Sequence, residues 1–544
     1  METTWPNDAG FDTDYQEHEP VPLVVKGSIP TYAAGVLYRT GPLGYKIKTN
    51  NGDIYKANHW FDGLSCVHRF QIDFDDDDNG EAKVSYRSRR TCDEYIQLVQ
   101  TTGKLDSITF AGKRDLCKTF FQKVMGMFTA DRNHGNVGVT VSINMPGGGY
   151  VAPSEKPAKI NGHSNGISTL HAKTDAAVLK KINPETLEPE GLARQNMLHP
   201  DLKGPFSAAH AKSDPISGDL YNFNLEFGSK CTYRVFHTSA STGKTEILAT
   251  FPGKPAYIHS LFLTESYVVL CVWNSLIKWN GISVLYNQNI VDSIAKFDPS
   301  QKASWYVIDR RQNKGLVATY ESIPFFCFHT VNAWEEPNAT DPSKVDIITE
   351  LSMYDNLDCV HRFFYDNITS SGQGVAGYKK RESCLPSQAQ FRLSSVNAIT
   401  SPTKRLPAEL LFKVDKFISM ELPTINPTYL TRRHRYSYGT ADRLKSSFMD
   451  GIVKFDNKTQ QSVIWNVEGH TPGEPIFVAD PDGFEEDDGV LLTVVLDGYA
   501  EKSYLLVLDA KDLSEKGRAE MAGPMAFGFH GSHKAVGRKY GGDI

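Results

Sequence analysis

The sequence lacks several features that mark common protein classes. Its 544 residues include only eight cysteines, and no two are spaced as a CxxC pair, which argues against zinc-ribbon and thioredoxin-like sites. Several cysteines lie inside apolar runs, so we expect reduced, structural thiols. No apolar run approaches the roughly 18 residues of a membrane-spanning helix. The first residues show no basic segment followed by an apolar core, so we expect no signal peptide and a cytoplasmic location. The sequons at Asn338, Asn367 and Asn457 are then background matches.

The sequence also lacks an excess of positive charge. The formal net charge is −6 and the pI is about 6.3, which gives no support for a nucleic-acid surface. Nothing in the composition indicates an obligate protein partner.

Short strands joined by tight turns dominate what is present. Aromatic residues make up 11% of the chain, beside 43 glycines and 28 prolines, a composition that suits many strands. Strand patterns recur about every ten residues, with clear examples at 35–39, 452–455, 490–496 and 504–508. A faint echo between 67–70 and 360–363, both reading Val-His-Arg-Phe, is what two blades of one propeller would leave.

Histidines in apolar settings recur along the chain. The stretch 325–334 reads as a buried strand around His329, and such a ring must be hydrogen-bonded or metal-bound. Similar settings surround His210, His259 and His530, at intervals of 49, 70 and 201 residues. A satisfied core histidine is the ordinary interpretation of any one of them. A radially repeated β architecture would bring all four to one axis.

One segment breaks the β pattern. Residues 116–128 place large apolar side chains at helical spacing, within an apolar insertion at about 105–130. The segment is either a helix packed on the propeller or a patch that contacts a membrane surface, such as a lipid body, or admits a lipid-like substrate.

Several ordered motifs resemble the carotenoid cleavage oxygenase family, from about residue 20 to the end. They are the four histidine settings and the stretches 59–63, 420–426, 474–478 and 529–531. The resemblance implies one domain over 1–544. It also implies an all-β fold, a seven-bladed β-propeller whose helical and loop insertions cap a substrate tunnel, with iron on its axis.

The resemblance further implies that one Fe(II) is held by His210, His259, His329 and His530. Four neutral imidazoles suit a first-row divalent metal and leave two octahedral positions for dioxygen or water. By motif, Glu421 and Glu474 match glutamates that accept the other N–H of the histidines. Asp175 stands at the position where the family pattern has a third glutamate. Because aspartate is one methylene shorter, we expect that hydrogen bond to be longer or water-mediated.

The implied reaction is oxidative cleavage of a conjugated carbon–carbon double bond by dioxygen, which yields aldehyde or ketone products. The apolar conjugated substrate is either a carotenoid or apocarotenoid, or a stilbene of the resveratrol type. In the stilbene-cleaving branch a tyrosine and a lysine bind the phenol, and Ala111 and Thr174 stand at those positions, which favours a polyene. Lys173 is one residue away, so a shift in register would restore the lysine.

Other interpretations of the chain remain open at this point. It could be a non-catalytic propeller that serves as a binding platform, with histidines buried for packing. It could also be an isomerohydrolase, which is a minority activity in the family. For the remaining histidines, among them His59, His68, His361, His434 and His533, we expect ordinary packing or exposure.

Overall fold

The computed structural model describes residues 5–74, 80–103, 105, 108–112, 135–148, 166–371 and 382–536. The apolar segment predicted at 116–128 lies outside these residues. Within them, no helix is both long enough and apolar enough to cross a membrane.

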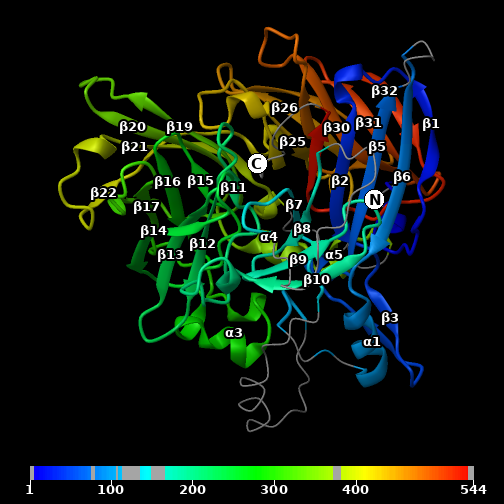
Figure 1. The fold of residues 1–544 in the computed structure, drawn as a ribbon, viewed down its shortest axis with the longest axis horizontal. Helices are drawn as coiled ribbons and strands as arrows, with labels where there is room; N and C mark the ends of the chain where they lie inside the picture. Colours follow the sequence, from blue (N-terminus) through cyan, green and yellow to red (C-terminus); the bar gives the residue numbers. More distant parts are fainter. Residues whose placement is uncertain are drawn as a thin grey trace.

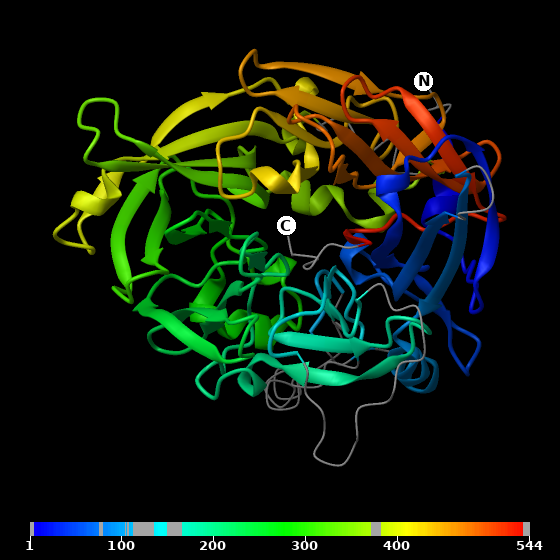
Figure 2. The same cartoon turned by 45° about the horizontal axis from the view of Figure 1, so that its top comes forward.

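The described strands form a ring of sheets around a central axis (Figures 1 and 2). Five of these sheets have four or five strands each, and apart from β22 their strands follow in chain order from one sheet to the next. The first two contain β7 (Thr140–Ile143), β8 (Leu170–Lys173), β9 (Val178–Ile182) and β10 (Pro189–Arg194), then β11 (Lys212–Ser213), β12 (Leu220–Glu226), β13 (Thr232–Thr238) and β14 (Thr245–Pro252). The third contains β15 (Phe262–Leu263), β16 (Tyr267–Val272), β17 (Ala303–Asp309), β18 (Leu316–Ser322) and β22 (Arg405–Pro407). The last two contain β19 (Phe326–Pro337), β20 (Val345–Tyr354), β21 (Ser387–Leu393) and β23 (Glu409–Lys413), then β24 (Glu421–Thr424), β25 (Tyr436–Ala441), β26 (Gly451–Asp456) and β27 (Gln461–Trp465).

A ten-stranded sheet completes the ring and joins the two ends of the chain. It contains β28 (His470–Pro472), β29 (Ile476–Ala479), β30 (Gly489–Asp497), β31 (Lys502–Asp509), β32 (Glu515–Glu520), β1 (Val21–Gly27), β6 (Ala82–Arg90), β5 (Ser65–Phe74), β2 (Gly35–Pro42) and β33 (Gly531–Ala535). The first half of β1 pairs with β6 and the second half pairs with β32, while β33 pairs with β2. The fold is therefore all-β and propeller-like. Instead of seven separate blades, the described residues form five separate sheets and this larger one, because β1 bridges its two halves.

The remaining elements are short. A hairpin joins β3 (Lys46–Lys48) to β4 (Ile54–Lys56). Among the described residues, the α-helices are α1 (Asp93–Thr102), α3 (Ile282–Asn287), α4 (Asp358–Arg362) and α5 (Tyr365–Ile368). The 3₁₀ helices are η1 (Asp8–Gly10), η2 (Thr31–Ala33), η3 (Trp60–Asp62), η4 (Gln195–Met197), η5 (Lys278–Gly281), η6 (Val291–Ser293), η8 (Val396–Ala398), η9 (Lys416–Ile418) and η10 (Pro427–Tyr429). Helices α1 and α3 project together from one side of the ring (Figure 1).

Local sequence explains most of these elements. The strands predicted at 35–39, 452–455, 490–496 and 504–508 all form, within β2, β26, β30 and β31. Strand β30 is buried at every position but the last, as expected for an apolar run packed on both faces. The echo between 67–70 and 360–363 is wrong as a blade signal, because 67–70 lies in β5 whereas 360–362 lies in α4. Four matching residues carry too little periodicity to separate a strand from a helical turn.

Candidate metal centre

The four histidines with apolar neighbours converge at the centre of the ring. His329 lies in β19, and His530 immediately precedes β33. His210 lies just before β11, and His259 lies between β14 and β15. A bridge between the backbone of His210 and Ser260 holds these two segments together, and the His210 N–H donates to the carbonyl of His259 (3.1 Å). Residues up to 320 positions apart in sequence therefore share one site.

Irregular backbone aims two of the key side chains. The ladder between β19 and β20 changes register on either side of Thr330, next to His329, and such bulges commonly redirect a side chain near a functional site. Leu422, which follows Glu421, has a φ of 49°, a left-handed conformation that is uncommon for a branched residue. Its N–H donates to Oε2 of Glu421 (2.9 Å). Both deviations lie next to a residue of the site, His329 in one case and Glu421 in the other.

The ring nitrogens lie at the spacing of metal ligands. Nε2 of His530 is 2.9 Å from Nε2 of His210 and 3.3 Å from Nε2 of His329. One ligand nitrogen from each of the four histidines lies within 4.8 Å of the others. Nitrogens bound at ~2.1 Å and at right angles around one ion would lie ~3 Å apart. The donor set therefore fits a single metal ion.

Three of the four histidines donate Nδ1–H to a buried carboxylate. His259 donates to Oδ1 and Oδ2 of Asp175 (2.8 and 2.9 Å), and His530 donates to Oε1 of Glu474 (2.7 Å). His329 donates to Oε2 of Glu421. The bond to Asp175 is direct and of ordinary length, so the longer or water-mediated contact that we predicted from the shorter side chain is wrong. These bonds place the proton on Nδ1 and leave the Nε2 lone pair free for a metal.

The surroundings keep two of the imidazoles, those of His210 and His530, in the neutral form that binds metals. Loss of hydration deep in the protein, and then the neighbouring histidines, hold the pKa of His210 and of His530 well below the usual value. Burial alone would raise the pKa of Glu421, but His329 and Tyr354 hold it below the ordinary value. Burial raises the pKa of Glu474 to about 7, against the opposing effect of Arg39. Neutral imidazoles beside carboxylates are a ligand set for a divalent first-row cation.

Each carboxylate has a further partner that sequence reasoning missed. The hydroxyl of Tyr257 donates to Asp175 (2.7 Å) and that of Tyr354 donates to Glu421 (2.7 Å). Nη1 of Arg39 donates to Oε2 and to the backbone carbonyl of Glu474, both at 3.0 Å. Arg39 is 1% exposed and lies in β2. An arginine inside an apolar strand was the one signal that could have marked it, because a buried guanidinium requires a partner.

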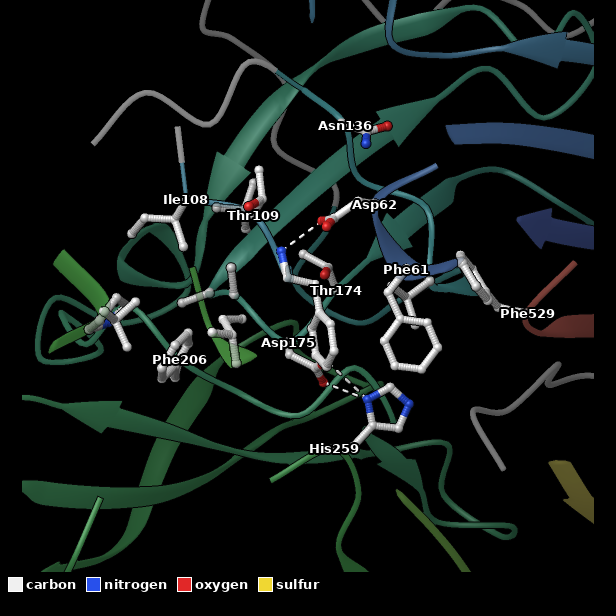
Figure 3. A pocket seen from close by; sticks show the side chains of 18 of the residues that line it. Phe61, Asp62, Ile108, Thr109, Asn136, Thr174, Asp175, Phe206, His259 and Phe529 are labelled. Atoms are coloured by element: carbon white, nitrogen blue, oxygen red, sulfur yellow. Dashed lines mark hydrogen bonds and ion pairs between the residues drawn. The ribbon is translucent and has the colours of Figure 1, made fainter. Parts of the chain in front are cut away.

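An aromatic cavity of about 440 Å³ reaches the histidine cluster. Figure 3 shows part of its wall, with His259 and Asp175 at one side. His259, His329 and His530 form part of its wall. Most of the rest is apolar, with the rings of Trp60, Phe61, Phe110, Phe206, Phe227, Phe328, Phe363 and Phe529. Such walls exclude water and favour a long apolar ligand.

Asp62 fixes one side of this aromatic cavity. Its carboxylate accepts hydrogen bonds from the backbone N–H groups of Phe110 (2.6 Å) and Ala111 (2.8 Å). Burial raises the pKa of Asp62 to about 6, although these two bonds oppose the shift. The contact ties η3 to the segment 108–112, which forms part of the cavity wall (Figure 3).

Comparison with known proteins identifies the family of this chain. A family model described as retinal pigment epithelial membrane protein matches residues 10–535. The chain belongs to this family. It is the carotenoid oxygenase family that the sequence motifs indicated.

Relatives in the carotenoid oxygenase family match over nearly the whole chain. A carotenoid dioxygenase of Neurospora crassa is 42% identical and covers 98% of this chain and 92% of the relative. A torulene dioxygenase of Fusarium fujikuroi is 39% identical, covering 97% of this chain and 94% of the relative. Among solved structures, cobalt-substituted Synechocystis apocarotenoid oxygenase has a TM-score of 0.70 at 20% identity, covering 96% of this chain and 97% of that one. This likeness supports the propeller-like fold.

A second cavity, of about 660 Å³, reaches the cluster through different walls. His210 faces only this cavity, His259 faces only the aromatic cavity, and His329 and His530 face both. The cluster therefore stands between the two spaces. Thr174 lines the aromatic cavity, whereas Lys173 lines the second one. Lys173 therefore does not line the aromatic cavity.

The other histidines considered lie outside the cluster. Nε2–H of His59 donates to the carbonyl of Val360 (2.9 Å), and a ring nitrogen of His68 bonds to the hydroxyl of Tyr86 (2.9 Å). His434 belongs to a buried network around Glu350, His533 contacts a backbone carbonyl of η2, and His361 is exposed. Ordinary packing and exposure account for all five, as the sequence predicted.

Proposed function

We propose that this protein is an Fe(II)-dependent dioxygenase that cleaves a conjugated carbon–carbon double bond of a carotenoid or apocarotenoid to carbonyl products. One observation carries the proposal: four imidazole nitrogens converge at metal-ligand spacing beside a cavity walled by aromatic rings. The relatives described as carotenoid and torulene dioxygenases support this reaction and substrate class.

The proposed ligands are His210, His259, His329 and His530. Iron bound there would supply the activation of dioxygen that the reaction requires. Asp175, Glu421 and Glu474 hold three of the rings in the correct tautomer and orientation. The aromatic cavity positions the polyene and keeps water from the reacting double bond. The substrate and dioxygen are therefore the proposed partners of the site.

The propeller is proposed to have seven blades. The five separate sheets supply five of them. The ten-stranded sheet supplies two, one around β30 and β31 and one around β5 and β6, with β1 hydrogen-bonded to both. We infer that residues 1–544 form this single domain. Two predictions rest on the sequence alone. One is that the insertion at about 105–130 serves as a substrate access route or membrane contact, and the other is the cytoplasmic location.

The polyene is favoured over a stilbene by the residues at the cavity. By the resemblance, Ala111 and Thr174 stand at the positions where the stilbene-cleaving branch has a tyrosine and a lysine. Thr174 lines the aromatic cavity, and Lys173 lines the other one. Neither Ala111 nor Thr174 can supply the phenol-binding pair of that branch. The named relatives point the same way.

The test is aerobic incubation of iron-loaded protein with torulene, a β-apocarotenal and resveratrol in parallel. We expect loss of polyene absorbance, carbonyl products labelled from ¹⁸O₂, and no loss of resveratrol. The variant His259→Ala should neither hold iron nor react. Absence of stoichiometric iron in the wild type would favour a binding platform, and unlabelled products would favour an isomerohydrolase; either result overturns the proposal.

A further inference from the structure

The two cavities beside the histidine cluster have different chemistry. Eight phenylalanine and tryptophan rings line the aromatic cavity beside a smaller number of polar side chains, such as Asp62, Asn136 and Lys203, whereas Phe477 is the one such ring among the described residues that line the second. The second cavity is instead rich in hydroxyl groups, from Thr140, Thr330, Thr424, Thr428 and Thr431. Acidic and basic side chains also line it, among them Asp214, Glu265, Arg311 and Arg432. We call this second cavity the polar passage.

One histidine is more accessible than the others, and it faces the polar passage. His210 is partly exposed, whereas His259, His329 and His530 are buried. The other three donate Nδ1–H to carboxylates, and among the described residues no carboxylate is bonded to His210. Its ring is therefore less firmly held than the rings behind it.

A divalent cation cannot easily cross an aromatic cavity. The ion must keep its water or exchange it for other oxygen and nitrogen ligands at each step, because burial of a bare charge is strongly unfavourable. Threonine hydroxyls and carboxylates can make that exchange, as they do along ion pathways, whereas phenylalanine and tryptophan rings offer no ligand atom of this kind.

We propose that a hydrated divalent metal ion reaches the centre through the polar passage and meets His210 first. The aromatic cavity then serves the hydrophobic substrate alone. His329 and His530, which face both spaces, mark the boundary where the two routes meet. This inference rests on the metal site of the proposed function and adds a route to it.

The experiment compares exposed residues that line the polar passage with an exposed residue that lines the aromatic cavity. Ile216 lies at the polar passage and is 73% exposed, with Thr428 also exposed there, whereas Asn196 is exposed at the aromatic cavity. The single variants Ile216→Cys, Thr428→Cys and Asn196→Cys are labelled with a bulky thiol reagent. The described native cysteines are buried or only partly exposed, and wild-type protein treated with the same reagent is the reference. The readout is the rate at which metal-free protein takes up Co²⁺, followed by the visible absorption of the bound ion.

Labels at Ile216 and Thr428 should slow Co²⁺ uptake at least ~10-fold, while cleavage by protein loaded with iron beforehand is unchanged. The label at Asn196 should lower cleavage and leave Co²⁺ uptake unchanged. Equal uptake rates in all labelled variants, or slower uptake only with the Asn196 label, would overturn the proposed route. Failure of the wild type to take up Co²⁺ at all would instead overturn the metal site itself.

Discussion

At the scale of single residues, charge balance explains why a buried arginine, Arg39, is bonded to a carboxylate beside the proposed metal ligands. The proposed ferrous ion would contribute two positive charges, and Asp175, Glu421 and Glu474, when ionised, would contribute three negative ones. Arg39, which is bonded to Glu474, brings the sum to zero. Without it, a charge of one sign would be left in a region shielded from water, which is unfavourable. Gly531 permits this arrangement, because a Cβ there would lie 2.5 Å from Cδ of Arg39.

Replacement of Arg39 by methionine should weaken metal retention. Glu474 would lose its cation and take up a proton, and it would then hold Nδ1–H of His530 less well. Loss of such an outer partner commonly lowers metal affinity by roughly 10–100-fold. Iron content after dialysis and Co²⁺ titration measure the effect. Arg39→Lys keeps the charge but not both hydrogen bonds, so its affinity should be intermediate; full affinity in Arg39→Met would contradict the role of the arginine.

His68 should make the stability of the protein sensitive to acid. It is fully buried, and burial, followed by the charge of Arg39, lowers its pKa to about 3. In the unfolded chain this histidine has a pKa of about 6.5. Below pH 6.5 the unfolded chain therefore binds a proton at His68 that the folded chain does not bind. The free energy of unfolding therefore does not depend on His68 above pH 6.5. It falls by ~1.4 kcal/mol per pH unit as the pH drops from there toward the pKa of His68 in the folded protein.

The variant His68→Gln removes this titration and can keep a bond to Tyr86. Between pH 7 and pH 5 it should lose about 2 kcal/mol less stability than the wild type, as measured by urea unfolding at both pH values. If the variant loses as much unfolding free energy between pH 7 and pH 5 as the wild type, His68 is not the group responsible.

Some residues of the site could be predicted from the sequence, and others could not. The histidines and the three carboxylates carry motifs, and the structure gathers all of them. Arg39, Tyr257 and Tyr354 carry none, and Arg39 lies 435 positions from its partner. Their role follows from which strands become neighbours in the ring. Nothing in the local sequence of β2 contains that information.

At the scale of elements, the link between η3 and the segment 108–112 determines the shape of the aromatic cavity. Asp62→Ala would leave the N–H groups of Phe110 and Ala111 without their acceptor, at a cost of about 1–3 kcal/mol for each buried group. Because Phe110 would move, we expect kcat/KM for the polyene to fall ~10-fold, with iron content unchanged.

The matched variant Asp62→Asn preserves the shape of the side chain and one acceptor oxygen. Its kcat/KM should lie between those of the wild type and Asp62→Ala. If Asp62→Ala cleaves the polyene like the wild type, the segment is held by other contacts.

Strands were easier to predict than helices in this chain. Alternating or continuous apolar runs bounded by turn residues found β2, β19, β26, β30 and β31 because that pattern has a direct physical cause in sheet packing. Helix α4 was missed because its five residues are too few to show a helical period. The ten-stranded sheet was missed as well, since the pairing of β1 with β32 joins residues almost 500 positions apart.

At the scale of the whole molecule, the metal centre ties together parts of the ring that are distant in sequence. The four histidines lie in or beside β11, β15, β19 and β33, which belong to four different sheets. A metal bound only by the folded state adds stability of about 2.7 kcal/mol when its concentration is a hundred times its dissociation constant. For a chain of 544 residues this corresponds to a rise in Tm of about 2–3 °C.

Removal of iron with a chelator should therefore lower the Tm by about 2–3 °C, and addition of Fe²⁺ or Co²⁺ should restore it. His210→Ala should unfold at one temperature with or without chelator, because a ligand to the ion is missing. Differential scanning calorimetry with metal analysis of the same samples makes the comparison. A wild type that loses its iron without any change in Tm would mean that the four sheets hold their positions without the ion, so that the convergence of the histidines is set by the ring alone.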